Sequence, residues 1–137
     1  MKVKEVMHGI IRVPSSATVV DAAVVMDAKD IAWVLVEENG VIVGIVTEKD
    51  LLRKIVAKGI DPSKVRVKDI ESSPLITIDE NSSLSEASEK MARHKIRRLV
   101  VTSDSRFVGV ITAKDISNNV NYLLTKGAMA YLPSYYP

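Results

Sequence analysis

Several residue types that would indicate particular chemistries are missing or scarce. The chain has no cysteine among its 137 residues, which excludes disulfide bonds and thiol chemistry. Its two histidines, His8 and His94, are not in a metal-ligand spacing such as His-x-x-x-His. The sequence also lacks a Walker A loop, a Gly-x-Gly-x-x-Gly loop and a Gly-x-Ser-x-Gly elbow. We therefore expect a protein that is not an enzyme, with no catalytic residue, no metal and no cofactor.

Long apolar runs are absent as well, so no segment is predicted to span a membrane. The first five residues, Met-Lys-Val-Lys-Glu, lack the apolar region of a signal peptide, and the expected location is cytoplasmic. Aromatic residues make up 4% of the chain and hydrophobic residues 47%, which predicts an aliphatic core. The length suits one domain, or two very small units that share a core.

Neither sign of charge dominates the chain. The net charge is +2, and both halves are nearly balanced, whereas nucleic-acid binders usually concentrate a basic excess. Basic residues are concentrated in one run of this chain, Arg93-His94-Lys95-Ile96-Arg97-Arg98. A solvated helix end explains Arg93 and Lys95 but explains the two later arginines less well. The charge pattern therefore does not favour nucleic-acid binding, which is kept as an alternative function.

A seven-residue stretch occurs twice, and the rest of the chain follows the same duplication. Residues 44–50 read Gly-Ile-Val-Thr-Glu-Lys-Asp, and residues 109–115 read Gly-Val-Ile-Thr-Ala-Lys-Asp, a shift of 65 positions. Near the start the shift is 64, with Val3-Lys4 against Val67-Lys68. Repetition at a fixed spacing predicts two similar structural units.

Hydrophobic periodicity and turn residues predict the same elements in both copies. In the first copy we expect strands at 10–13, 31–36 and 41–46, with Asn39-Gly40 as a hairpin turn. Thr18 and Thr47 should cap helices, and the second of these should end near Gly59. The expected inward-facing positions include Leu51, Leu52, Ile55 and Val56 in the first copy and Leu84, Ala87, Ser88 and Met91 in the second.

The second copy should have strands at 75–78, 99–101 and 107–111, with two further helices. The predicted fold class is α+β, with two tandem β-α-β-β-α repeats. Residues 1–60 form the first repeat, 61–66 a linker, 67–125 the second repeat and 126–137 a C-terminal tail. The tyrosines of the tail could pack on a partner chain, or the tail could be mobile.

The Thr-x-x-Asp ending of each repeated stretch has two interpretations. It is close to a capping box, which needs no ligand. A helix start also suits an anion such as phosphate, and a fixed carboxylate can accept hydrogen bonds from a ribose diol. Two of the chain's four such starts, at Thr47 and Thr112, follow a glycine and two apolar residues at matching places. A ligand role for these two therefore stands beside the capping role.

The paired units, the Asn-Gly hairpin and the duplicated Gly-apolar-apolar-Thr-x-x-Asp signature resemble a pair of CBS domains, the arrangement called a Bateman module. The resemblance covers nearly the whole chain except the tail and implies a stand-alone small CBS-domain protein with repeats about a pseudo-two-fold axis. Such modules bind AMP, ADP, ATP or sometimes S-adenosylmethionine in clefts between the repeats and regulate a partner.

Carried over to this chain, the resemblance implies specific ligand contacts. Asp50 and Asp115 would bind ribose hydroxyls, with Thr47 and Thr112 at phosphate or ribose oxygens. Ile45 and Val110 would lie by the adenine. The cleft that holds Asp50 would use Pro74, Leu75 and Ile76 as its adenine wall, and the opposite cleft would use Ile10, Ile11 and Val13.

Family members often carry basic residues for phosphate at the start of the second strand of a repeat. Here Arg97 and Arg98 stand there in the second copy, whereas the first copy has Ala32 and Trp33. Because arginine binds two phosphate oxygens at once, we expect the cleft of Asp50, with both arginines, to be the better nucleotide site. The ligand expected first is AMP, and Trp33 is expected in the core.

The resemblance also bears on partners. Four amphipathic helices cannot all be covered within so short a chain, so a homodimer is expected, and regulation requires an effector protein that the sequence does not identify. A purely structural interaction module with empty clefts is the remaining alternative.

Overall fold

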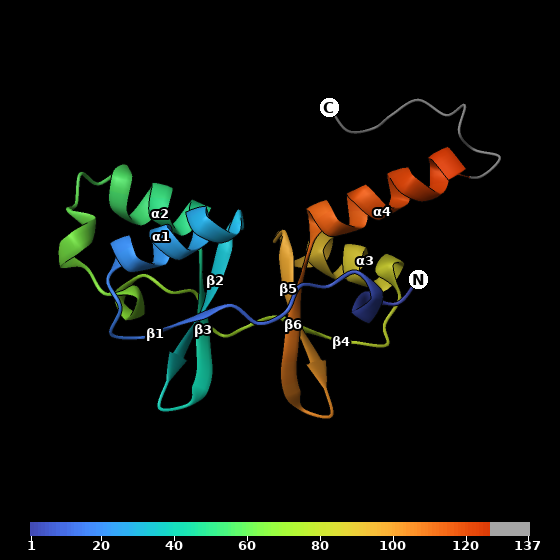
Figure 1. The fold of residues 1–137 in the computed structure, drawn as a ribbon, viewed down its shortest axis with the longest axis horizontal. Helices are drawn as coiled ribbons and strands as arrows, with labels where there is room; N and C mark the ends of the chain where they lie inside the picture. Colours follow the sequence, from blue (N-terminus) through green and yellow to red (C-terminus); the bar gives the residue numbers. More distant parts are fainter. Residues whose placement is uncertain (127–137) are drawn as a thin grey trace. The chain divides into compact units, whose positions relative to one another are not determined.

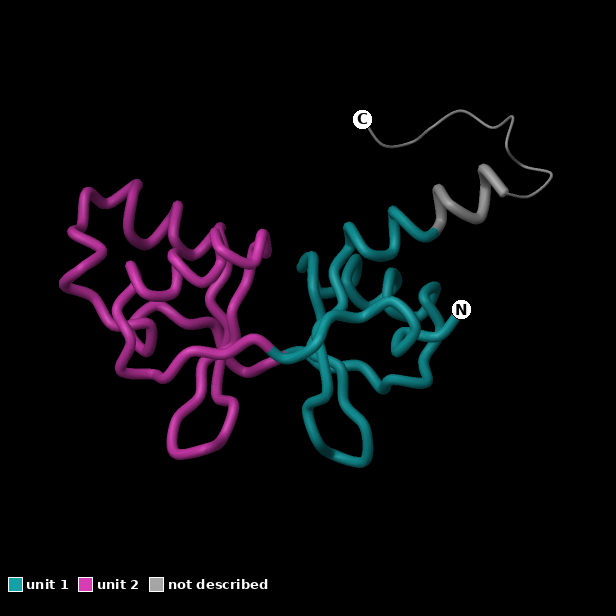
Figure 2. Tube along the Cα trace, in the orientation of Figure 1, with its two compact units in different colours: residues 1–10, 76–137 teal, residues 11–75 magenta. Residues whose placement is uncertain are grey.

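The computed structural model describes residues 1–126, with side chains up to residue 119 (Figure 1). The described chain forms two compact units, which are coloured separately in Figure 2. Unit 2 consists of residues 11–75, and unit 1 consists of residues 1–10 together with the chain from residue 76 onward. The tyrosines of the predicted tail lie outside the described residues.

Unit 2 is built on a three-stranded sheet in the order β1-β2-β3. Strand β1 (Arg12–Pro14) is parallel to β2 (Trp33–Glu38), and the crossover helix α1 (Val19–Lys29) joins them, as a parallel pair requires. Strand β3 (Val41–Thr47) returns antiparallel to β2. Asn39 and Gly40 both have positive φ in the turn between them, which confirms the predicted Asn-Gly hairpin.

After β3 the chain of unit 2 is helical but irregular. Helix α2 (Glu48–Leu51) continues into a π-helical turn, η2 (Leu52–Val56), and two short 3₁₀ helices follow, η3 (Pro62–Lys64) and η4 (Val67–Asp69). The helices lie toward one end of the β2–β3 hairpin and its turn lies at the other (Figure 1).

Unit 1 repeats this plan. Its sheet has the order β4-β5-β6, with β4 (Thr77–Asp79) parallel to β5 (Arg98–Ser103) and β6 (Arg106–Thr112) antiparallel to it. Helix α3 (Leu84–His94) makes the crossover, and α4 (Ala113–Lys126) follows β6. The 3₁₀ helix η1 (Val3–Glu5) from the start of the chain belongs to this unit. The predicted α+β fold of two repeats is thereby confirmed.

Each repeat receives a short segment from the other. Val3 is fully buried in the core of unit 1, and its backbone N–H donates to the carbonyl of Ser82 at 2.8 Å. The corresponding Val67 is fully buried in unit 2, and its N–H donates to the carbonyl of Ala17 at 2.9 Å. The predicted boundaries 1–60 and 67–125 divide the sequence into repeats. In the structure, residues 1–10 belong to the unit of the second repeat, and residues 67–75 belong to the unit of the first repeat.

Some predicted inward positions are wrong. Leu52 and Val56 have 59% and 68% of their surface exposed, while Ile55 is only 2% exposed. Positions 52 and 56 lie about 100° around the helix from 51 and 55, so the predicted stripe was too wide for one face. Ser88 is exposed for the same reason, because its neighbour Ala87 fills the core. Trp33 is 1% exposed, which confirms its place in the core.

Candidate functional site

The end of β3 places the first repeated Thr-x-x-Asp pair. Thr47 has extended backbone angles and caps α2, with its Oγ1 accepting from the N–H of Asp50 at 3.3 Å. In return, Oδ2 of Asp50 accepts from the N–H of Thr47 at 2.9 Å. Both residues are buried, with 8% and 7% of their surfaces exposed. This reciprocal pattern is a capping box, so the local interpretation of the motif is confirmed.

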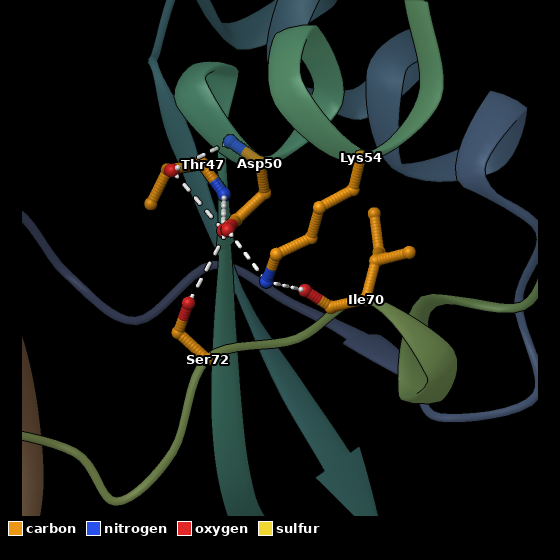
Figure 3. Close-up of polar contacts among 5 residues, drawn as sticks. All are labelled: Thr47, Asp50, Lys54, Ile70 and Ser72. Carbon is orange, nitrogen blue, oxygen red and sulfur yellow. Dashed lines mark hydrogen bonds and ion pairs between the residues drawn. The ribbon is translucent and has the colours of Figure 1, made fainter. Parts of the chain in front are cut away.

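The carboxylate of Asp50 makes more contacts than a capping box requires (Figure 3). Oδ2 also accepts from the hydroxyl of Thr47 at 3.1 Å. Oδ1 accepts from the hydroxyl of Ser72 at 3.3 Å and lies 3.0 Å from Nζ of Lys54. The same Lys54 ammonium donates to the carbonyl of Ile70 at 2.7 Å. Asp50 therefore connects the helix start to the 67–75 segment that enters from the second repeat.

The 67–75 segment is held against β3 by a pair of backbone hydrogen bonds. The N–H of Ser72 donates to the carbonyl of Ile45 at 2.8 Å, and the N–H of Ile45 donates back at 3.1 Å. Both β3 and the 67–75 segment are parts of unit 2. Together they hold five of the predicted contact residues, Ile45, Thr47, Asp50, Pro74 and Leu75. Ile45 and Leu75 are half-buried, while Pro74 is exposed. Ile11 and Val13 also belong to unit 2, and Val13 is a core residue.

Unit 1 has a corresponding arrangement. The N–H of Thr112 donates to Oδ2 of Asp115 at 2.9 Å, and Oγ1 of Thr112 accepts from the N–H of Asp115 at 3.1 Å. His8 takes the place of Ser72: it exchanges two 2.9 Å backbone hydrogen bonds with Val110, and its Nε2 lies 2.7 Å from Oδ1 of Asp115. Val110 is fully buried, Ile10 and Ile76 are half-buried, and all three belong to this unit.

The repeated glycine of the motif allows the exchanged segments to approach the strands. A Cβ at Gly109 would collide with the backbone oxygen of His8, and a Cβ at Gly44 would lie 2.5 Å from Oε2 of Glu71. The close neighbour of each glycine is therefore another part of the same chain. Burial raises the pKa of Glu71, and the nearby charge of Glu38 adds to this effect.

The two arginines lie in the unit of Asp115. Arg98 begins β5 opposite Thr112 in the register of β5 and β6, and the carbonyl of Arg97 accepts from the N–H of Ala113 at 2.8 Å. Arg97 is exposed and Arg98 is half-buried. Trp33 holds the corresponding register position opposite Thr47 in unit 2. The expected combination of Arg97 and Arg98 with Asp50 stays a prediction.

Three residues of these networks were missed by the sequence reasoning. His8 and Ser72 correspond under the 64-residue shift that already aligned Val3 with Val67, so the repeat could have revealed them. Lys54 stands four positions after Asp50, a spacing that brings side chains together on a helix.

Comparison with known proteins identifies the repeats. A family model described as CBS domain matches residues 3–57 and again residues 67–122. The chain belongs to the CBS-domain family. CBS domains are regulatory modules rather than catalytic ones, in agreement with the lack of enzyme motifs noted above.

Individual relatives agree with this assignment. An uncharacterized protein of Methanocaldococcus jannaschii is 35% identical over 114 residues, which is 81% of this chain, and the chain spans 61% of that relative's length. A solved protein with CBS domains from Burkholderia ambifaria matches with a TM-score of 0.84 and 27% identity, covering 90% of this chain and 96% of its own. A CBS-domain protein from Pyrobaculum aerophilum, complexed with AMP, matches with a TM-score of 0.75 and 27% identity, covering 84% and 89% of the two chains.

Two other kinds of site are absent from the part of the chain that the structure describes. Within residues 1–126, no helix is long and apolar enough to cross a membrane. The same residues contain no cluster of three His, Asp or Glu side chains that could hold a metal ion.

Proposed function

We propose that this CBS-domain pair is a regulatory module that binds an adenine nucleotide, AMP in the first place, and acts on a partner protein. The observation that carries the proposal is that each repeat fixes a largely buried carboxylate, Asp50 or Asp115, at the same strand end beside half-buried apolar residues, so that at least one of them can serve as the ribose acceptor. A ribose diol needs a fixed hydrogen-bond acceptor, and a purine needs an apolar wall. The similar P. aerophilum protein with AMP supports this choice of ligand.

Titration calorimetry with AMP, ADP, ATP and S-adenosylmethionine tests this function. We expect the nucleotides to bind and S-adenosylmethionine to bind more weakly, because Arg97 and Arg98 favour phosphate over a cationic sulfonium. The double variant Asp50→Asn/Asp115→Asn should lose binding.

Asp21→Asn is the matched control for that titration. Asp21 forms the same kind of capping box with Thr18, with its N–H 3.1 Å from the threonine hydroxyl, but it is exposed on α1. Its substitution should cost about 1 kcal/mol of stability and leave nucleotide affinity unchanged. If none of the four compounds binds the wild-type protein, the two aspartates are caps only and the structural interaction module takes the place of this proposal.

We also propose that the module forms a homodimer through the helices of unit 2. Val20 and Val24 on α1 and Leu52 and Val56 on η2 are all exposed. At the corresponding positions of the second repeat the sequence has the polar residues Ser85, Glu89, Ser117 and Asn121, so this set of four apolar residues is not repeated there. Exposed apolar surface of this kind is typical of interfaces.

Charges on the same helices favour a second copy as the occupant. The exposed charges of α1 are mainly acidic, with Asp21 and Asp27 against Lys29. Those of α2 and η2 are mainly basic, with Lys49 and Arg53 against Glu48. A two-fold axis that sets α1 of one copy against α2 and η2 of the other would pair these opposite charges.

Nucleic-acid binding is the second candidate function. The side chains of Arg93, His94, Lys95 and Arg97 are all exposed, as a phosphate-binding patch requires. A gel-shift series at increasing salt distinguishes it, because binding to a phosphate backbone weakens steeply with salt.

A further inference from the structure

The carboxylate of Asp50 has no capacity left for another donor. It accepts from the N–H and the hydroxyl of Thr47 on Oδ2 and from the hydroxyl of Ser72 on Oδ1, and Oδ1 also forms an ion pair with Nζ of Lys54 at 3.0 Å. An ionised carboxylate offers about four lone-pair positions, so three hydrogen bonds and the ion pair with Lys54 occupy them. A ribose diol, which must donate two hydrogen bonds, could bind Asp50 only by displacing some of them.

Lys54 is the contact of Asp50 that is hardest to displace. Its ammonium lies 3.0 Å from Oδ1 and 2.7 Å from the carbonyl of Ile70, so it is held from two sides (Figure 3). The side chain of Asp50 is 10% exposed, and removing its cationic partner would leave a largely buried negative charge without compensation. A neutral diol cannot replace that charge.

The carboxylate of Asp115 can accept further hydrogen bonds. Its carboxylate accepts from the N–H of Thr112 on Oδ2 and contacts His8 on Oδ1, so about two lone-pair positions remain. The counterpart of Lys54 is Asn119, and its amide donates to the backbone carbonyl of Asp115 at 2.7 Å rather than to the carboxylate. His8 is itself 47% exposed at its side chain, so the contact lies at the surface.

We infer that Asp115, and not Asp50, binds the ribose, and that Lys54 is the residue that makes the two repeats unequal by occupying Asp50. This inference rests on the proposed adenine-nucleotide function. It reverses the preference for Asp50 that the position of the arginines suggested, and it agrees with the placement of Arg97 and Arg98 in the unit of Asp115.

Titration calorimetry with AMP on single variants tests the inference. The wild-type protein should bind one AMP per chain. Asp115→Asn should weaken binding about 10- to 100-fold, the effect of losing hydrogen bonds to a charged acceptor, while Asp50→Asn stays within about twofold. Lys54→Met should create a second AMP site per chain, and the double variant Lys54→Met/Asp50→Asn should return to one. Lys58→Met, an exposed lysine shortly after η2, is the matched control and should leave both affinity and stoichiometry unchanged.

A measurement on the wild-type protein covers the case in which a variant unfolds. In amide-resolved NMR spectra, AMP should shift the signals of Thr112 and Asp115 and leave those of Thr47 and Asp50 in place. Loss of binding in Asp50→Asn with normal binding in Asp115→Asn would overturn the inference while the nucleotide function stands. Two AMP molecules bound to wild-type protein, with no change in Lys54→Met, would also overturn it. Failure of AMP, ADP and ATP to bind any form would instead remove the proposed function itself.

Discussion

Nε2 of His8 lies 2.7 Å from Oδ1 of Asp115, although the two residues are 107 positions apart in the sequence. Together with the backbone hydrogen bonds between His8 and Val110, this contact attaches the beginning of the chain to the strand end of the second repeat. The same relationship between Ser72 and Asp50 uses a neutral hydroxyl and is supplemented by a lysine. The two repeats therefore share a backbone plan but differ in the groups that face their aspartates.

Replacing His8 tests the contribution of this attachment to stability. His8→Ala removes the side-chain contact with Asp115 and should lower the free energy of unfolding by about 1 kcal/mol, the usual net value of one hydrogen bond. Urea denaturation would measure the change. His94→Ala is the control, because His94 is an exposed residue at the end of α3 and its loss should have little effect. Equal effects of the two substitutions would mean that the His8 contact contributes nothing.

The two motif glycines should differ in their tolerance of alanine. At Gly109 the new Cβ would meet the backbone oxygen of His8, which can move only if the N-terminal segment moves, and we expect a loss of about 1–3 kcal/mol. At Gly44 the new Cβ would meet the flexible end of Glu71, which can rotate away, so the loss should be smaller. Thermal or urea unfolding would compare the two variants. Gly9→Ala serves as the control because nothing lies within 4 Å of its added Cβ, and a ranking with Gly44 as the more sensitive site would contradict this account.

Glu71 should make stability depend on pH. Oε2 of Glu71 is buried and finds no hydrogen-bond partner among the residues that the structure describes, and burial raises the pKa of this carboxyl above its ordinary value of 4.5. The folded state thus holds the proton more tightly than the unfolded state, so this group lowers stability as the pH rises from 4.5 through the raised pKa.

Glu71→Gln should remove that dependence. We expect it to stabilise the protein at neutral pH by about 0.5–1 kcal/mol, a value reduced because part of the side chain remains in contact with solvent. The gain should disappear below pH 4.5, where the carboxyl is neutral in both states. Urea unfolding at several pH values would measure it, with Glu89→Gln, an exposed glutamate on α3, as the control. A gain independent of pH would refute the assignment to this carboxyl.

The proposed dimer predicts a sharp difference between two charged substitutions. Val24→Glu places a charge in the exposed apolar surface of α1 and should shift the protein from dimer to monomer at micromolar concentration, as measured by sedimentation equilibrium. Ser85→Glu, on the exposed face of α3, should leave the dimer intact. A monomeric wild-type protein would exclude the proposal directly.

Much of the fold could be predicted from the sequence because local patterns determine it. The Asn39-Gly40 turn, the capping threonine Thr47 and the buried position of Trp33 all depend on residues close to one another in the chain. The error at Leu52 and Val56 has the same origin, since an apolar residue was assigned to the core from its spacing alone. Exposed apolar residues such as Leu52 and Val56 have the same side chains as core residues, so residue type alone does not separate the two.

The partners of the two aspartates could not be predicted in this way. Asp115 and His8 meet only because the N-terminal segment packs in the unit of the second repeat, and nothing in the local sequence of either residue indicates that exchange. The contact of Lys54 with Asp50 has a recognisable spacing, but whether the lysine faces the carboxylate depends on the π-helical turn of η2, which the spacing alone does not predict. The capping boxes could be predicted from the sequence. The number of further hydrogen bonds that each carboxylate can accept could be counted only in the structure.

The exchange of segments also has a consequence for the order of folding. Unit 2 is one continuous stretch, so it can close as soon as residue 75 has left the ribosome. Unit 1 needs contacts such as His8 with Asp115, and bringing such distant residues together is entropically costly and slow. Residues 1–10, with the apolar Val3 among them, must therefore wait without their partners until residues 76–115 have been made.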